Sequence, residues 1–237
     1  MILNFEPAGS FRGTNLLRQA DNLAYAYETT FKSVDADGAP NAYHPDNIGL
    51  DWLANAGYPN TNWWRSVLVA DPHNSSKAYA QPDGEFEGYF VAMTSLRSPQ
   101  GNKLSTSTYV DSRMVPYVVI PTGFSPSGLH NVAKPGDVGF ARHLGNGKTT
   151  TFIVADSGGG SDAKLGEASI ALFILLGGQE PNPKNGQGVP SGKIQYVIFP
   201  GSRKAGSAIW PRTNEDIHIH EQVMDLLTKT PGIDMNG

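Results

Sequence analysis

Short runs of β-branched, aromatic and other apolar residues recur along the chain, and most of them are bounded by glycine or proline. Runs of this length with such boundaries are typical of β-strands. They predict strands over residues 66–70, 88–94, 116–120, 138–142, 149–155 and 194–199. The chain is therefore expected to be mainly β.

Three stretches space their apolar residues as a helix does. They are residues 16–31, residues 166–176, which end before Gly177-Gly178, and residues 214–229. A segment dense in Asp, Gly, Pro and Asn follows residue 33. We therefore expect an N-terminal extension over residues 1–33 that packs on a single domain over residues 34–237.

The composition narrows the class of protein. The 237 residues include 27 Gly and 17 Pro, and only 17% of them are charged, which fits one β-rich domain with many turns. The net charge of −4, without a basic patch, argues against nucleic acid as a partner. No apolar run reaches the roughly 18 residues of a membrane span, so no membrane partner is expected. The absence of cysteine excludes disulfides and thiolate chemistry.

Two acidic residues stand at the ends of predicted elements. Asp156 follows the strand run 149–155 and precedes Ser157 and three glycines, whereas Glu167 stands where the next helix is expected to begin. The loop between them is long enough to turn back and bring the two carboxylates together. Two carboxylates around one glycosidic bond are the usual equipment for its hydrolysis, because one protonates the leaving oxygen and the other activates water or attacks the sugar.

Each carboxylate also has a structural explanation. An Asp before glycines commonly forms a turn, and a Glu in a first helical turn commonly interacts with the helix dipole. From the residues alone these structural explanations are the stronger ones. If the pair is catalytic, the helix N-terminus favours Glu167 as the ionised base, and the apolar strand favours Asp156 as the acid with a raised pKa. The reverse assignment stays open.

A series of short segments, taken in order, resembles a known family. The segments are VDADGAPNAYHP (34–45), YVDS (109–112), PYVVIP (116–121), GDV (136–138), VADSG (154–158), GEAS (166–169), NP (182–183) and IQYVIFPGS (194–202). Over about residues 34–227 they resemble glycoside hydrolase family 75, the fungal and bacterial chitosanases. The resemblance implies an endo-acting enzyme that cleaves β-1,4 linkages of chitosan, with Asp156 and Glu167 as the essential carboxylates. It also implies inversion, for which the two carboxyl groups stand about 6.5–9.5 Å apart with a water between them.

A looser resemblance concerns the fold. A strand that ends in Asp-x-Gly, then a loop and a short helix that ends in Leu-Gly, is similar to double-psi β-barrel proteins, which include lytic transglycosylases. It implies one domain built on a six-stranded double-psi-like β-barrel with long loops and a few short helices, with the catalytic barrel over residues 34–237. Because a fold does not determine a function, two alternatives remain. One is a lytic transglycosylase-like enzyme that acts on peptidoglycan, and the other is a non-catalytic, expansin-like barrel that binds polysaccharide.

Five further residues are candidates for binding the sugar. Asp35 and Asp37 would pair with the amines of chitosan, which are cationic at mildly acidic pH, although a turn explains them equally well. Tyr43 and His44 lie in the same family-like segment, and the His suits a sugar hydroxyl or a local structural bond. Asp137, before the strand run 138–142, is either a turn residue or a third carboxylate that supports the pair.

Metal and cofactor chemistry is not expected. The segment Asp35-Ala36-Asp37-Gly38 resembles the start of a calcium loop, but no Glu follows at the spacing of that motif. One of Trp63 and Trp64 is expected in the core. We expect a secreted, extracellular monomer that acts on chitosan or chito-oligosaccharides. Residues 1–7 lack the basic and apolar regions of a signal peptide, so the leader would be absent from this sequence.

Overall fold

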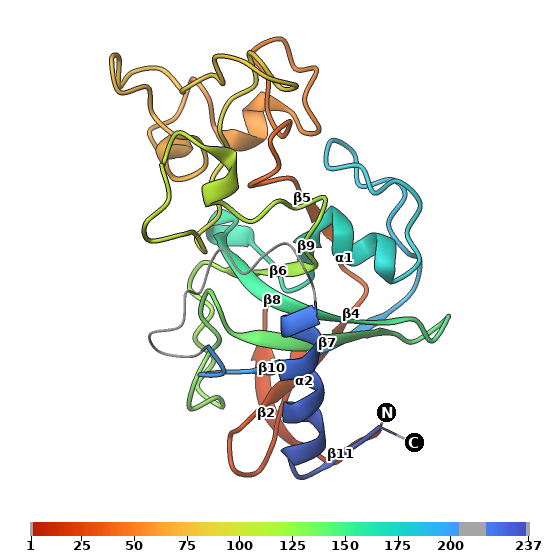
Figure 1. The fold of residues 1–237 in the computed structure, drawn as a ribbon. Helices are drawn as coiled ribbons and strands as arrows, with labels where there is room; N and C mark the ends of the chain where they lie inside the picture. The colour runs from red at the N-terminus through yellow and green to blue at the C-terminus, as the bar shows by residue number, and fades with distance from the viewer. Residues whose placement is uncertain (1, 204–216, 236–237) are drawn as a thin grey trace.

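A computed structural model of the chain describes residues 2–203 and 217–235 (Figure 1). Its strands are β1 (Ile2–Leu3), β2 (Glu6–Phe11), β3 (Thr14–Arg18), β4 (Tyr25–Thr29), β5 (Ser33–Asp35), β6 (Tyr117–Pro121), β7 (Val138–His143), β8 (Thr149–Gly158), β9 (Glu167–Ser169), β10 (Ile194–Phe199) and β11 (Ile233–Asp234). The helices are α1 (Ile170–Leu175) and α2 (Ile217–Lys229), with short 3₁₀ helices η1 (Leu53–Ala56), η2 (Trp63–Ser66), η3 (Thr106–Thr108) and η4 (Gly160–Asp162).

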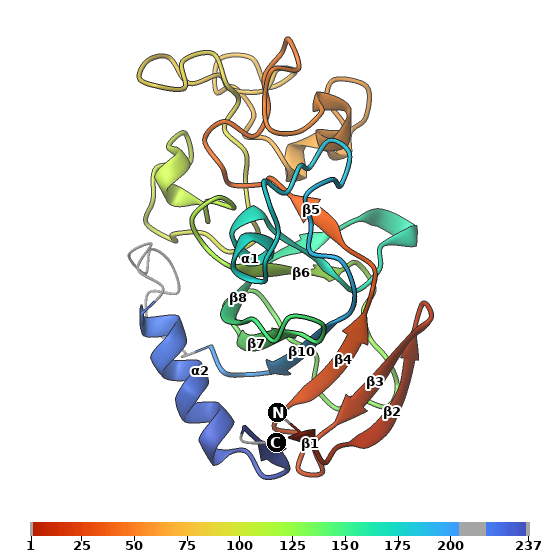
Figure 2. The same cartoon turned by 90° about the vertical axis from the view of Figure 1, so that its right-hand side faces the viewer.

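One nine-stranded sheet organises the molecule, in the order β2-β3-β4-β10-β7-β8-β6-β9-β5. Alternate residues of its central strands enter two different cores. On β6, for example, Val118 packs in one core with α1, whereas Val119 packs in the other with α2. The α2 residues Ile219 and Val223, four positions apart, are buried in that second core. Figures 1 and 2 show α2 lying along the sheet near β7 and β10.

The helix predicted over residues 16–31 is wrong, because this segment forms β3 and β4. The turn between them depends on Gln19, whose Oε1 accepts hydrogen bonds from the amides of Asp21 and Leu23, and on the left-handed backbone of Asn22. β4 then pairs along its whole length with β10, so residues of the expected N-terminal extension belong to the main sheet.

The other predicted elements fall into two groups. The strand runs 116–120, 138–142, 149–155 and 194–199 are confirmed as β6, β7, β8 and β10. Residues 66–70 and 88–94 were predicted as strands but form isolated bridges such as Leu68 with Ala92, because this part of the chain folds as loops. The helix predicted over 166–176 begins only at Ile170, and α2 confirms the third, whose residues 214–216 lie outside the described part of the chain.

The fold is mainly β with few short helices, as predicted. In the pairing of the described residues, β2 and β5 are the two ends of the sheet order, and no pairing joins them into a closed barrel. The six-stranded double-psi-like barrel therefore stays a prediction. Within residues 2–203 and 217–235, no helix has the length and apolar character that crossing a membrane requires.

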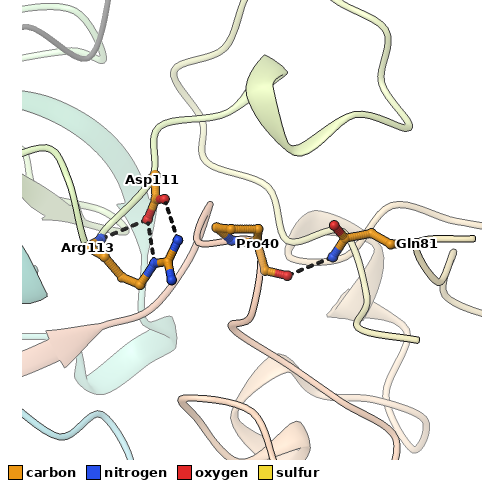
Figure 3. A network of polar contacts seen from close by, with 4 residues as sticks. All are labelled: Pro40, Gln81, Asp111 and Arg113. Atoms are coloured by element: carbon orange, nitrogen blue, oxygen red, sulfur yellow. Dashed lines mark hydrogen bonds and ion pairs between the residues drawn. The ribbon is translucent and has the colours of Figure 1, made fainter. Parts of the chain in front are cut away.

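Residues 36–115, between β5 and β6, form a region that we call the loop lobe, which lies beyond β5 at one end of the sheet (Figure 1). It has a separate small core that includes Tyr43, Trp64 and Phe90. Polar contacts such as the bond from Gln81 Nε2 to the Pro40 carbonyl, 2.7 Å, hold distant parts of the lobe together (Figure 3). The ion pair of Arg113 with Asp111, 3.2 Å, lies where the lobe returns to the sheet.

Candidate functional site

A β-bulge determines where Asp156 points. In the parallel pair of β6 and β8, Val118 lies level with Val154, but Val119 lies level with Asp156 because Ala155 is an extra residue. Such a residue reverses the alternation of side chains beyond it. Without the bulge Asp156 would face the core that contains Val154. With the bulge it lies on the same face of the sheet as Val119.

Glu167 reaches the same place from the other side of β6. β9 runs antiparallel to β6, and Ala168 pairs with Val118. Continuing this register by one residue places Glu167 level with Val119, and therefore on the same face as Asp156. The two backbones are two strand spacings apart, which is about 10 Å in a flat sheet.

β5 adds two more carboxylates to this face. Asp35 pairs with Ser169 of β9, and Asp37 follows in the turn after β5. One oxygen each from Asp35, Asp37 and Asp156 lie within 4.8 Å of one another. Because two strands separate β5 from β8 in the sheet, this closeness requires a strongly curved sheet end, which also brings Asp156 and Glu167 closer than a flat sheet would. The spacing alone does not identify a metal site, since acidic clusters are common without an ion.

Two buried tyrosines hold the turn after β5. Tyr43 donates a hydrogen bond from its hydroxyl to Asp37 Oδ1 at 2.8 Å. Tyr117 of β6 donates to the Asp37 carbonyl at 3.0 Å. The Asp37 amide in turn donates to Asp35 Oδ1 at 2.8 Å. The turn is therefore held by the loop lobe and by β6, the strand that lies between those carrying Asp156 and Glu167.

Burial raises the pKa of every carboxyl in this cluster. The pKa of Asp156 rises to about 6, because burial outweighs the hydrogen bonds from Ser95 and Ser157 that lower it. The pKa of Glu167 rises to about 7, through burial first and then through the charges of Asp156 and Asp51. Burial and mutual repulsion also hold the pKa values of Asp35 and Asp37 well above the usual range. A positively charged ligand would stabilise the ionised carboxylates of this cluster.

A family model described as "Fungal chitosanase of glycosyl hydrolase group 75" matches residues 33–228. The chain belongs to this family. The match confirms the resemblance over about residues 34–227 and places the chain among glycoside hydrolases of the chitosanase type. No curated protein matches the chain significantly.

The acidic cluster brings together four of the residues expected from the sequence, namely Asp35, Asp37, Asp156 and Glu167, and Tyr43 is bound to Asp37. Their roles in catalysis and in binding substrate stay predictions. His44 is half-buried beside Tyr43, where its Nδ1 accepts a hydrogen bond from the Asp46 amide and its ring packs edge-on against Tyr89. These are local bonds within the loop lobe, and a contact of His44 with substrate stays a prediction.

The structure does not bring Asp137 into the cluster. Its two carboxylate oxygens accept hydrogen bonds from the backbone amides of Lys134 and Arg203, each at 2.9 Å. The following residue, Val138, lies in the core that also contains Ala155 and Val119, so alternation directs Asp137 to the opposite face. These contacts are those of a structural turn residue, and its expected support of Asp156 and Glu167 stays a prediction.

Two residues that interact with the acidic cluster were not expected from the sequence, and both come from the loop lobe. Asp51 contributes to the raised pKa of Glu167, and its Oδ1 accepts hydrogen bonds from the Trp52 amide and from Asn55 Nδ2. Ser95 donates directly to Asp156. Neither lies in a recognisable motif, so no local signal identifies them. As expected for the tryptophan pair, one member is in the core, since Trp64 is buried and Trp63 is exposed.

Replacement of Gly38 by alanine is expected to destabilise the turn that carries Asp37. Gly38 has a φ of 77°, and a Cβ there would lie 2.0 Å from the Val110 carbonyl oxygen. Gly84 has a φ of 86° with nothing within 4 Å of a Cβ. In chemical denaturation, Gly84→Ala should cost about 1–2 kcal/mol from the left-handed backbone alone, and Gly38→Ala clearly more. Equal losses would show that the close approach to Val110 does not exist.

The acidic cluster predicts that stability falls as pH rises. Carboxyls with a raised folded-state pKa stabilise the fold fully below their unfolded pKa, about 4, and this contribution is lost as pH rises through the folded values. For Asp156 and Glu167 these are about 6 and about 7. The melting temperature of the free protein should therefore be lower at pH 8 than at pH 5. Asp37→Asn should reduce the difference, and the exposed Asp83→Asn should not. A higher melting temperature at pH 8 would contradict the description of the cluster.

Proposed function

We propose that this chitosanase-family chain is an endo-acting hydrolase of the β-1,4 linkages of chitosan that inverts the anomeric centre, with Glu167 as general acid and Asp156 as general base. The observation that carries the proposal is the register of the sheet. Asp156 and Glu167 flank one residue of β6 from opposite sides and face the same way. Their strands are separated only by β6, and the curved sheet end brings the two side chains closer than a flat sheet would, which suits a pair with a sugar linkage and one water between them.

The assignment of roles reverses the one expected from the sequence. Glu167 was expected in the first turn of a helix, but it belongs to β9, and Ser169 is the N-cap of α1. The helix dipole argument for an ionised Glu167 therefore fails. The higher pKa, about 7, suits Glu167 to hold the proton that the leaving oxygen needs.

Asp156 has the better environment for a base. Its Oδ1 accepts hydrogen bonds from the Ser95 amide at 3.0 Å, the Ser95 hydroxyl at 2.5 Å and the Ser157 amide at 2.7 Å. Hydrogen bonds to the charged form favour ionisation. The charge of Asp156 in turn raises the pKa of Glu167, so the pair carries one proton between their two pKa values.

The reaction then needs only these two groups and water. Glu167 transfers its proton to the glycosidic oxygen while the bond from C1 to that oxygen breaks. A water molecule on the opposite face forms a new bond to C1 and gives a proton to Asp156. The product carries the inverted configuration at C1, and the pair regains its starting state when the proton returns to Glu167 through solvent.

The remaining carboxylates support a cationic polymer as substrate. Asp35, Asp37 and Asp51 are further carboxyls around the pair. Burial raises the pKa of all three, and repulsion by neighbouring carboxylates adds to the rise for Asp35 and Asp37. Protonated glucosamine amines would offset that repulsion. Asp37 and Glu167 are half-buried rather than sealed, which leaves them open to a ligand. Because the polymer is too large to enter a cell, we further propose that the enzyme is secreted. Its action as a monomer stays a prediction.

Incubation with chitosan of low acetylation tests this function. Solution viscosity should fall well before reducing ends accumulate, as endo cleavage requires. Chitin and peptidoglycan serve as neutral and mixed-charge comparison polymers and should be cut far more slowly. Release of peptidoglycan fragments with no cleavage of chitosan would contradict the proposal and favour a transglycosylase-like enzyme.

A further inference from the structure

Ser95 is exposed between two buried residues of the loop lobe, Thr94 and Leu96. The Thr94 hydroxyl donates to the Leu96 carbonyl at 2.6 Å, which closes a tight turn around Ser95. The Leu96 amide donates to the carbonyl of Ala155 at 2.7 Å. Ala155 is the extra residue of the bulge in β8. The bulge that turns Asp156 therefore also anchors the segment that carries Ser95.

From this position Ser95 presents two donors to one acceptor. Its amide and its hydroxyl both donate to Asp156 Oδ1, across 61 positions of sequence. The third hydrogen bond, from the Ser157 amide, reaches the same oxygen. Within the described part of the chain, Oδ2 accepts none of the hydrogen bonds to this carboxylate. One oxygen is therefore held and the other is left to bind water.

We propose that Ser95 is a positioning residue of the catalytic site, which holds Asp156 ionised and directs its Oδ2 toward the attacking water. The inference rests on the proposed function, in which Asp156 is the base. The loop lobe then does more than contact substrate, because Ser95 of the lobe controls whether Asp156 of β8 is protonated. The hydroxyl bond to a carboxylate is of the charge-assisted kind, which is short and strong.

The ionised form of Asp156 depends on its hydrogen bonds, because the charges of the neighbouring groups do not stabilise it. The groups that interact with its charge from the neighbouring elements are acidic or neutral: Asp35 and Asp37 at the end of β5, Glu167 on β9 and the phenol of Tyr117 on β6. None of these groups carries a positive charge that would favour a carboxylate. Removing a donor should therefore change the protonation of Asp156 directly.

Ser95→Ala removes the hydroxyl and keeps the amide. The acidic limb of the pH profile of kcat/KM should move up by about one pH unit, since a hydrogen bond to a charged group is of that size. The alkaline limb, which reports loss of the second proton from the coupled pair, should move much less, and kcat should fall more than KM changes. Ser95→Thr restores a hydroxyl and should return the acidic limb toward its original position. Ser66→Ala, which removes an exposed hydroxyl bonded to the Trp63 carbonyl, should leave both limbs unchanged.

Carbon NMR titration of the Asp156 carboxyl, in the wild type and in Ser95→Ala, tests the inference with a readout that does not depend on enzyme activity. A pKa raised in Ser95→Ala supports it, and the same pKa in both proteins overturns it. An unmoved acidic limb in an active Ser95→Ala variant also overturns it. If the wild type does not cut chitosan at all, the proposed function fails, and the titration still decides whether Ser95 sets the protonation of Asp156.

Discussion

Replacement of Glu167 by glutamine is expected to lower kcat on chitosan by about 10²–10⁴-fold, because the glycosidic oxygen then leaves without a proton. Glutamine has nearly the same shape, and Glu167 is only half-buried at the start of β9, so the fold should persist. The measurement is kcat and KM on chitosan, together with a thermal melt of the variant.

A substrate with a good leaving group tests the role of Glu167 itself. An activated aryl glycoside of a glucosamine oligomer releases a stabilised phenolate that needs no protonation. Glu167→Gln should therefore retain most of its activity on this substrate while it loses activity on chitosan. Equal losses on both substrates would mean that Glu167 is not the acid, and would favour the reverse assignment of roles.

Asp156→Asn is expected to abolish hydrolysis of both substrates, since the attacking water still needs a base when the leaving group is good. We expect a loss in kcat of at least about 10²-fold with little change in KM. Stability should hold or rise above pH 6, because the variant removes a buried charge whose pKa is raised to about 6. The measurements are kinetics on chitosan and on the activated glycoside, and melting temperature at pH 5 and pH 8.

Asp137→Asn is the matched control for Asp156→Asn. Both residues are buried, and both accept hydrogen bonds from backbone amides. An asparagine at 137 turns one acceptor into a donor that faces an amide, so the melting temperature should fall while kcat is kept. If Asp137→Asn lost kcat at an unchanged melting temperature, Asp137 would belong to the catalytic site and the account of the pair would need revision.

The local parts of this site were predictable from the sequence. An apolar strand that ends in Asp156, and a glycine-rich loop that returns to Glu167, are visible as residue patterns, and the structure places both residues on one face of the sheet. For Asp35 and Asp37, the sequence supported a role in a turn as well as it supported a role in binding substrate. Only the pairing of β5 with β9 shows that their turn lies against the same carboxylates.

The non-local parts were not predictable. The bulge at Ala155 exists only because β6 lies beside β8, and no residue type marks it in the sequence. The packing of the loop lobe brings Asp51 and Ser95 to the site. The lobe is held by isolated β-bridges, which leave no periodic pattern of apolar residues in the sequence. The segment at residues 16–31 shows the same limit, since its short apolar runs suit a helix or two strands, and pairing with β10 selects strands.

Proton NMR of the first minutes of chitosan oligomer hydrolysis tests the central claim, that Asp156 and Glu167 work on opposite faces of one linkage with a water between them. The account predicts that the α-anomer of the new reducing end accumulates first and then mutarotates toward equilibrium. Initial accumulation of the β-anomer would contradict it, because retention requires one carboxylate to attack the sugar directly.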